Sequence, residues 1–116
     1  MTDAALLRVK NTAGILRLTL MRGAQRNPLS SAMLEELVAA LDAAATDKTV
    51  RAIVMAGEAP GFCGGHDLKE MTAHRQDDDG GRAFYEALFA RCSTMMQMIV
   101  AHPRVIIAEV NGIATA

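Results

Sequence analysis

A glycine-rich segment that follows an apolar run is the part of this sequence best suited to chemistry. Residues 57–70 read GEAPGFCGGHDLKE, and the compact apolar run 50–56 precedes them. Glycines let a backbone approach a ligand closely, and the first turn of a helix leaves amide N–H groups without partners. A strand, a glycine-rich turn and a helix start in this order predict a site for a full or partial negative charge.

Two kinds of ligand group carry such a charge: a nucleotide phosphate and a carbonyl oxygen. A Walker loop requires Gly-Lys-Ser/Thr at the helix start, whereas Gly65-His66-Asp67 stands here, and the Rossmann glycine pattern is absent. Asp67 would also repel a phosphate. A carbonyl oxygen that becomes an oxyanion or enolate is stabilised by neutral hydrogen-bond donors in a site that excludes water. Each such donor lowers the activation barrier by about 2.7–4 kcal/mol.

The elements that must position this loop follow from hydrophobic periodicity and from turn and cap residues. We expect strands at 6–10 and 15–20, joined by a turn at 11–14, and further buried strands at 50–56 and 104–110. We expect helices from Ser30 or Ser31 to about 46–48, at 66–73 and at 82–101. Strands that alternate with crossover helices predict an α/β fold with mostly parallel pairing after an initial hairpin.

Two of the expected helices show one apolar face each. The residues on these faces are Leu34, Leu37, Val38 and Leu41 in the first helix, and Phe84, Leu88, Met95 and Ile99 in the last. This spacing is that of a helix packed on a core. The methionines at 95, 96 and 98 are more easily explained as core or subunit contacts than as a binding groove.

Composition excludes several classes of function. The net charge of −1 with mixed signs gives no reason to expect nucleic acid or an anionic membrane as a partner. Cys63 and Cys92 lie too far apart in sequence to suggest a disulfide framework, and no signal peptide or membrane span is visible. These features predict a cytoplasmic protein of one domain. Cys63 and His66 form only half of a zinc-ligand pattern, so we expect no metal site.

The amino-acid sequence of the glycine-rich segment resembles that of a known family. PGFCGGHDLKEM at 60–71 resembles the oxyanion-loop signature of the enoyl-CoA hydratase/isomerase (crotonase) superfamily. Three further stretches resemble the same family in order: 15–30 with Arg22, Asn27 and Leu29, then 34–65, then 102–116. The wording is most similar to the subgroup called enoyl-CoA hydratase domain-containing proteins.

The resemblance implies a crotonase-like ββα spiral, of which residues 1–116 would be the N-terminal portion, interrupted before the second oxyanion-hole segment. It implies an enzyme that hydrates 2-enoyl-CoA in the syn sense, with the CoA thioester as substrate and no cofactor. The alternatives are an isomerase or acyl-CoA hydrolase on the same fold, or a non-catalytic binder of acyl-CoA or protein. A homotrimer or hexamer is expected at full length, and the 116-residue chain alone is expected to be inactive.

The resemblance also implies the site residues. The backbone N–H of His66 would be one oxyanion donor, whereas its side chain would not be the catalyst. The residues implied to contact substrate or CoA are Gly64, Gly65, Asp67, Leu68, Lys69, Arg26 and Pro28. Pro28 departs from the family pattern and lacks the N–H that another residue would offer there.

Overall fold

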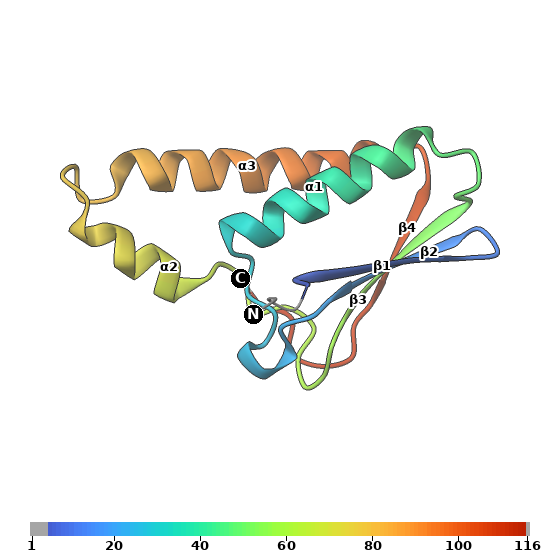
Figure 1. Cartoon of the computed structure of the whole chain (residues 1–116), viewed down its shortest axis with the longest axis horizontal. Coiled ribbons are helices and arrows are strands. Elements are labelled where there is room, and N and C mark those ends of the chain that lie inside the picture. The colour runs from blue at the N-terminus through green and yellow to red at the C-terminus, as the bar shows by residue number, and fades with distance from the viewer. Residues whose placement is uncertain (1–4, 116) are drawn as a thin grey trace.

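One mixed sheet of four strands organises the molecule, in a computed structural model that describes residues 5–115 (Figure 1). The strands are β1 (Leu7–Thr12), β2 (Ile15–Leu20), β3 (Ala52–Gly57) and β4 (Val105–Glu109), in the order β1-β2-β3-β4. β1 pairs antiparallel with β2, whereas β2–β3 and β3–β4 pair in parallel. The expected α/β fold with parallel pairing after an initial hairpin is confirmed.

The hairpin between β1 and β2 is tighter than the sequence suggested. Its turn consists of Ala13 and Gly14, with φ of 52° and 89°. Positive φ at both central residues is the geometry of the two-residue turns that match strand twist. The Asn11 side chain accepts a hydrogen bond of 3.0 Å from the Gly14 amide. Asn11 therefore belongs to the strand, and the expectation of a turn over 11–14 is wrong by two residues.

Three α-helices follow the strands: α1 (Ser31–Thr46), α2 (Leu68–Ala73) and α3 (Arg82–Ala101), with short 3-10 turns η1 (Gly23–Gln25) and η2 (His74–Gln76). Ser30 caps α1, because its hydroxyl accepts a 3.1 Å hydrogen bond from the Met33 amide. The predicted bounds of α1 and α3 are confirmed. α2 begins two residues later than expected, because Asp67 is its capping residue.

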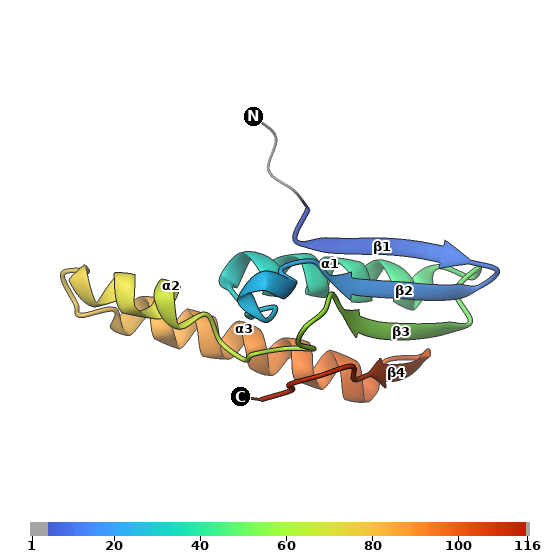
Figure 2. The same ribbon diagram turned by 90° about the horizontal axis from the view of Figure 1, so that it is seen from below.

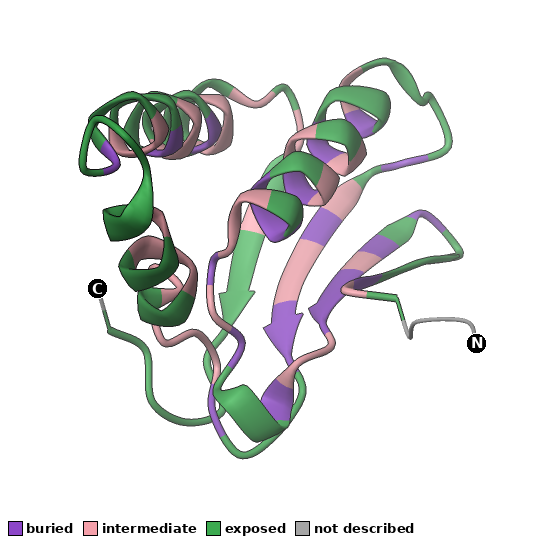
Figure 3. Cartoon of the chain, turned by 60° about the vertical axis from the view of Figure 1, so that its left-hand side comes forward, coloured by how far each residue is buried: buried purple, intermediate pink, exposed green. Residues whose placement is uncertain are grey.

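The core lies between the sheet and the helices that cover one of its faces (Figures 1 and 3). Leu18 from β2, Ile53 from β3 and Leu34 from α1 are each at most 1% exposed. The predicted inner face of α1 is confirmed, with Val38 only half-buried. None of the helices in residues 5–115 is long and apolar enough to cross a membrane.

The α2–α3 hairpin extends beyond the sheet as an arm (Figure 1). The radius of gyration is 14.8 Å, whereas a compact chain of this length would have about 13 Å. Of the 20 residues in α3, Leu88 and Met95 are buried, while Phe84 and Ile99 are half-buried. The arm therefore rests on few core contacts, which makes its turn geometry important.

β4 is far more exposed than its apolar sequence suggested. Val105 is 66% and Ile107 is 51% exposed. β4 is the edge strand of the sheet, and no helix among the described residues covers the face seen in Figure 2. The expectation of a buried strand at 104–110 is therefore wrong, because an apolar strand is buried only when both of its faces have a covering layer.

Candidate functional site

The glycine-rich loop 58–67 is held between two other segments at the carboxyl ends of β3 and β4. Segment 27–29 approaches it from one side, and segment 111–115 runs along the other. Cys63 and Ala114 form an isolated parallel bridge, and the Cys63 amide donates to the Ile113 carbonyl at 3.0 Å. Ligands of open α/β sheets bind at this end of the strands, so the loop lies where a site is expected.

Asn27 anchors the loop from within. It is completely buried, and its side-chain oxygen accepts a 2.8 Å hydrogen bond from the Arg22 amide. Its side-chain nitrogen lies 3.0, 3.0 and 3.2 Å from the carbonyl oxygens of Glu58, Gly61 and Phe62. The side-chain amide of Asn27 thus connects the start of η1 with residues 58–62 of the loop.

Two glycines allow the three segments to approach so closely. A Cβ at Gly112 would lie 2.3 Å from the Pro60 carbonyl oxygen, and one at Gly23 would lie 2.2 Å from that of Ala59. Both contacts are with backbone atoms, which cannot turn away as a side-chain tip can. Any larger residue at either position would push the loop out of place.

The amide of His66 is left free by the way the loop is paired. Leu29 and His66 form an isolated bridge, in which the Leu29 amide donates to the Gly65 carbonyl at 2.7 Å. Gly65 has a φ of 81°, a conformation that favours glycine. Within residues 5–115, the His66 N–H has no hydrogen-bond acceptor. A fixed backbone donor is therefore available to a ligand.

Asp67 and Glu70 fix the start of α2 immediately after this donor. The Asp67 carboxylate accepts hydrogen bonds from the amides of Lys69 and Glu70, at 3.0 and 3.2 Å. Glu70 in turn accepts from the Ser31 amide at 2.9 Å and from its hydroxyl at 2.8 Å. The first turn of α2 is therefore fastened to the first turn of α1, which limits movement next to His66.

A pocket of about 460 Å³ opens beside the His66 amide. Its lining comes from three segments: Ala24, Gln25, Arg26, Pro28; Gly64, His66, Asp67, Leu68, Lys69; and Ile113, Thr115. Seven of the eight residues that the sequence singled out line it. The exception is Gly65, which is buried and whose carbonyl pairs with Leu29.

The pocket wall is cationic. Arg26 and Lys69 both line it, and neither forms an ion pair with any residue between 5 and 115. The carboxylate of Asp67, by contrast, already accepts two backbone hydrogen bonds. Two unpaired cations beside a free amide donor suit a ligand with both phosphate and carbonyl oxygens.

The role of Asn27 was missed by sequence reasoning, as were the pocket contributions of Ala24, Gln25, Ile113 and Thr115. One signal was present, because Asn tolerates the left-handed conformation and its amide bonds in two directions. Asn27 does adopt a φ of 51°. However, its bonded carbonyls lie 31 to 35 residues away in sequence, so no local pattern could identify them.

The remaining reactive side chains do not assemble a second centre. Within residues 5–115, no group of three or more His, Cys, Asp or Glu side chains is placed to hold a metal ion. Cys63 and Cys92 are free thiols. Burial raises the pKa of the Cys92 thiol, and the nearby Cys63 raises it further. Cys92 therefore stays protonated at neutral pH and is a poor nucleophile.

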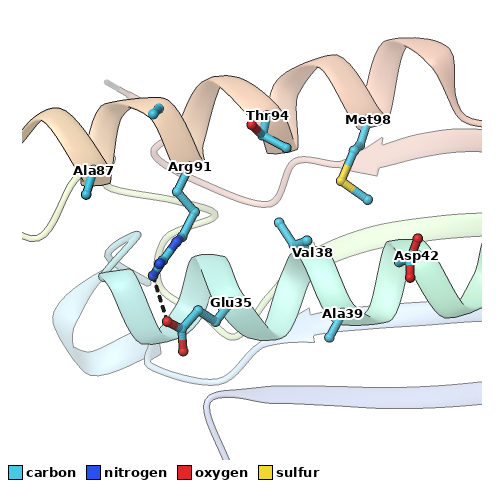
Figure 4. Close-up of a pocket in the computed structure, with 9 residues that line it drawn as sticks. Glu35, Val38, Ala39, Asp42, Ala87, Arg91, Thr94 and Met98 are labelled. Carbon is cyan, nitrogen blue, oxygen red and sulfur yellow. Dashed lines mark hydrogen bonds and ion pairs between the residues drawn. The ribbon is translucent and has the colours of Figure 1, made fainter.

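A larger groove of about 580 Å³ lies between α1 and α3 (Figure 4). It shares no lining residue with the His66 pocket. Ala87 of α3 points toward α1 in this groove, and an ion pair of 2.6 Å between Glu35 and Arg91 bridges it (Figure 4). The groove holds none of the residues of the glycine-rich loop, so we place the candidate site at the His66 pocket.

The chain is similar in sequence to known proteins. Residues 10–116 match the family described as enoyl-CoA hydratase/isomerase. The chain is 36% identical over 115 residues to mouse enoyl-CoA hydratase domain-containing protein 3, mitochondrial, which covers 99% of this chain and 37% of the mouse protein. The chain therefore spans little more than a third of the length of that relative.

Solved structures give the same result. An enoyl-CoA hydratase/isomerase family protein from Silicibacter pomeroyi superposes with a TM-score of 0.86 at 43% identity, over 96% of this chain and 45% of that one. Human enoyl-CoA hydratase domain-containing protein 3 superposes with a TM-score of 0.85 at 34% identity, over 97% of this chain and 42% of that one. The likeness thus extends from sequence to backbone.

The expectation of a cytoplasmic protein is corrected by these relatives. The matching proteins from mouse, rat, human, Xenopus laevis and Danio rerio are all named mitochondrial, which points to mitochondria rather than the cytoplasm. Composition and cysteine spacing do not indicate the cellular compartment, because targeting is encoded in targeting segments and not in the core of a folded domain.

Proposed function

The chain belongs to the enoyl-CoA hydratase/isomerase family, and from that premise we propose that its His66 pocket binds an acyl-CoA thioester. The His66 N–H donates a hydrogen bond to the thioester carbonyl oxygen, and the CoA portion lies along Arg26, Pro28 and Lys69. The observation that carries this proposal is the His66 amide, which is rigidly held and has no acceptor within residues 5–115.

The chemistry that such a donor serves is stabilisation of negative charge on the carbonyl oxygen. When a nucleophile adds to the double bond of a 2-enoyl thioester, charge moves onto that oxygen as an enolate forms. A preorganised N–H stabilises this charge more than it stabilises the neutral ground state, which lowers the barrier. We therefore propose hydration of 2-enoyl-CoA as the reaction of the complete site.

One relative supports hydration over isomerisation or hydrolysis. The chain is 48% identical over 58 residues to 2,3-dehydroadipyl-CoA hydratase of Escherichia coli, which covers 50% of this chain and 23% of that protein. The isomerase and hydrolase reactions would use the same carbonyl donor with different acid and base residues. A non-catalytic member would keep the pocket and only bind the thioester.

Residues 5–115 supply one donor and a pocket for the ligand, but no carboxylate in that pocket is free to act as an acid or a base. Asp67 is the only carboxylate among the pocket-lining residues, and it is occupied by two backbone amides. Hydration needs a group that activates water and one that protonates the α-carbon. We therefore propose that the 116-residue chain by itself binds CoA thioesters without hydrating them.

The test removes the His66 N–H while keeping the fold. His66→Pro deletes the donor, and this N–H makes no hydrogen bond with any residue between 5 and 115. His66→Ala keeps the donor and controls for the side chain. Both variants are made in the longest natural polypeptide that contains residues 1–116, and hydration of a short 2-enoyl-CoA is followed.

The proline variant is expected to be slower than the alanine variant by about 10²–10³ in kcat, with similar thermal unfolding temperatures. Equal rates for two folded variants would remove the proposed role of the amide. If the unaltered polypeptide neither hydrates enoyl-CoA nor binds any CoA thioester, the proposed function itself is wrong.

A further inference from the structure

The side chain of His66 has surroundings that thioester binding by its backbone does not explain. Its ring packs edge-to-face against Phe89 of α3, with ring centroids 5.3 Å apart and planes at 65°. Its Nδ1 is buried and has no hydrogen-bond partner among residues 5–115. A buried polar atom without a partner is uncommon in a native protein, and it restricts where the ring hydrogen can lie.

The burial of Nδ1 assigns the proton of the neutral ring to Nε2. A buried N–H without an acceptor is rarer than a buried lone pair without a donor. The lone pair of the neutral ring therefore lies on Nδ1 and its hydrogen on Nε2.

The Nε2–H donor is available to a ligand. Within residues 5–115, the His66 side chain makes no hydrogen bond, and His66 lines the same pocket as Arg26 and Lys69. The ring and the free amide belong to one residue. In the proposed complex, a thioester whose carbonyl oxygen is bound by that amide has the atoms next to its carbonyl group near the imidazole.

Resting on the proposed function, we propose that the His66 side chain is a specificity-determining residue for the acyl group. Its Nε2–H donates a hydrogen bond to an oxygen atom carried by the acyl chain, in a carboxylate, keto or hydroxyl group. The packing against Phe89 fixes the direction of this donor. A plain hydrocarbon chain would bury the Nε2–H donor without giving it an acceptor, and the lost hydrogen bond with water would weaken binding of that chain.

The test measures binding, so it does not depend on turnover. The ligands are saturated acyl-CoA thioesters of equal chain length that end in a methyl, a hydroxyl or a carboxylate group. The protein is the longest natural polypeptide containing residues 1–116. His66→Phe keeps a ring against Phe89 without the donor, and His66→Gln supplies an N–H donor again. Dissociation constants are determined by calorimetry, and thermal unfolding verifies that both variants are folded.

The unaltered protein is expected to bind the two oxygenated ligands about tenfold more tightly than the methyl-ended one. His66→Phe should abolish this preference, and His66→Gln should restore most of it. A preference unchanged by His66→Phe would overturn the proposal. So would an equal weakening of all three ligands, which would place the ring against the common CoA portion.

A preference for the carboxylate alone would also overturn the proposal, because the attraction would then come from Arg26 and Lys69 rather than from a hydrogen bond. Failure of the unaltered protein to bind any of the three thioesters would instead refute the proposed function. The two failures are therefore distinguishable.

Discussion

At the scale of single residues, Asn27 determines the shape of the loop more than any residue that lines the pocket. Asn27→Ala would remove the hydrogen bond from the Arg22 amide and those to three carbonyl oxygens, at a completely buried side chain. It would also put alanine at a φ of 51°. We expect a loss of about 3 kcal/mol in the free energy of unfolding, measured by urea denaturation.

Asn111 provides a matched control for this measurement. Its side-chain amide makes a single hydrogen bond of 2.9 Å, to the Gly57 carbonyl, and the residue is exposed. Asn111→Ala should therefore lower the free energy of unfolding by only about 1 kcal/mol. Equal losses for the two alanine variants would show that Asn27 is not the main anchor of the loop.

The two cations of the pocket lead to a prediction about the ligand. Lys69→Gln and Arg26→Gln should each weaken binding of a CoA thioester by about fivefold at low salt, because both side chains are exposed. The effect should fall as the salt concentration rises. The matching pantetheine thioester, which lacks the nucleotide phosphates, should bind both variants and the unaltered chain equally well.

Lys48→Gln is the control for net charge, since Lys48 lies in the turn between α1 and β3 and does not line the pocket. Isothermal titration with both ligands gives the comparison. If Lys48→Gln weakens CoA thioester binding as much as Lys69→Gln does, the cations act through the overall field and not through contact.

The single residues show what a sequence can and cannot indicate. A free backbone donor in this loop could be inferred, because a strand, a glycine-rich turn and a helix start are contiguous in the chain, and the family resemblance implied that the donor is the amide of His66. The anchoring by Asn27 could not, because its partners lie in another part of the chain. The orphaned Nδ1 of His66 could not either, because it depends on how closely the loop and α3 pack.

At the scale of elements, the junction between η2 and α3 depends on one glycine. Gly81 precedes α3 with a φ of 94°, and a Cβ there would lie 2.8 Å from the His74 carbonyl oxygen. Gly80 has a φ of 70°, but a Cβ there would meet no atom within 4 Å. Gly80→Ala should therefore cost only the conformational strain, about 1 kcal/mol, and Gly81→Ala about twice as much.

Thermal or urea unfolding of the two alanine variants checks this order. The comparison is direct because the two positions are adjacent and both have positive φ. A Gly80→Ala variant that is less stable than Gly81→Ala would mean that the contact with His74 does not restrain the arm. Circular dichroism should show that α3 remains helical in both.

The start of α3 also leads to a pH dependence. The Asp79 carboxylate accepts hydrogen bonds from the amides of Ala83 and Gly81, which lower its pKa from the ordinary value of 3.8. The folded pKa lies below the unfolded one. The stability that Asp79 adds is therefore complete above about pH 4 and is lost as the pH falls through the folded pKa.

Asp79→Asn removes this ionisable group, so the stability difference between it and the unaltered chain should shrink as the pH falls below 3.8. Asp78→Asn makes the same change of net charge at an exposed neighbour that forms no hydrogen bond within residues 5–115. Urea unfolding at several pH values provides the data. A difference between Asp79→Asn and the unaltered chain that does not change with pH would contradict the capping role.

Helix ends were predictable because their signals are local. Ser30 caps α1 through its own side chain, and Pro103 prevents α3 from continuing. The burial of β4 was not predictable in the same way. Its sequence is that of a strand covered on both faces, yet covering layers are supplied by other elements, and those among residues 5–115 lie on one face only.

At the scale of the whole molecule, helices cover one face of the sheet, and no element among residues 5–115 covers the other, open face (Figures 1 and 2). The open face carries Arg17 and Glu109, which form an ion pair of 3.1 Å, and beside them the apolar Val105 and Ile107. The chain spans 37% of the mouse relative and 45% of the matching Silicibacter pomeroyi chain. An apolar face of this kind favours association with another surface.

We therefore expect the isolated 116-residue chain to self-associate through β4 and the open face of the sheet. β4 combines an edge that no strand within residues 5–115 pairs with and exposed apolar side chains, which is the arrangement that promotes strand-to-strand association. Ile107→Lys places a charge in this surface and should raise the concentration at which association begins by about tenfold. Sedimentation velocity over a concentration series measures it.

Val100→Lys is the matched control, because Val100 is 88% exposed but lies on α3 rather than on the open face. Adding the same charge there should leave association nearly unchanged, since the residue is already in solvent and outside the proposed contact. If the two lysine variants behave alike, exposed apolar area in general drives association and β4 has no special part in it. A chain that stays monomeric at every concentration would contradict the prediction, because exposure of β4 and of the open face would then not drive association.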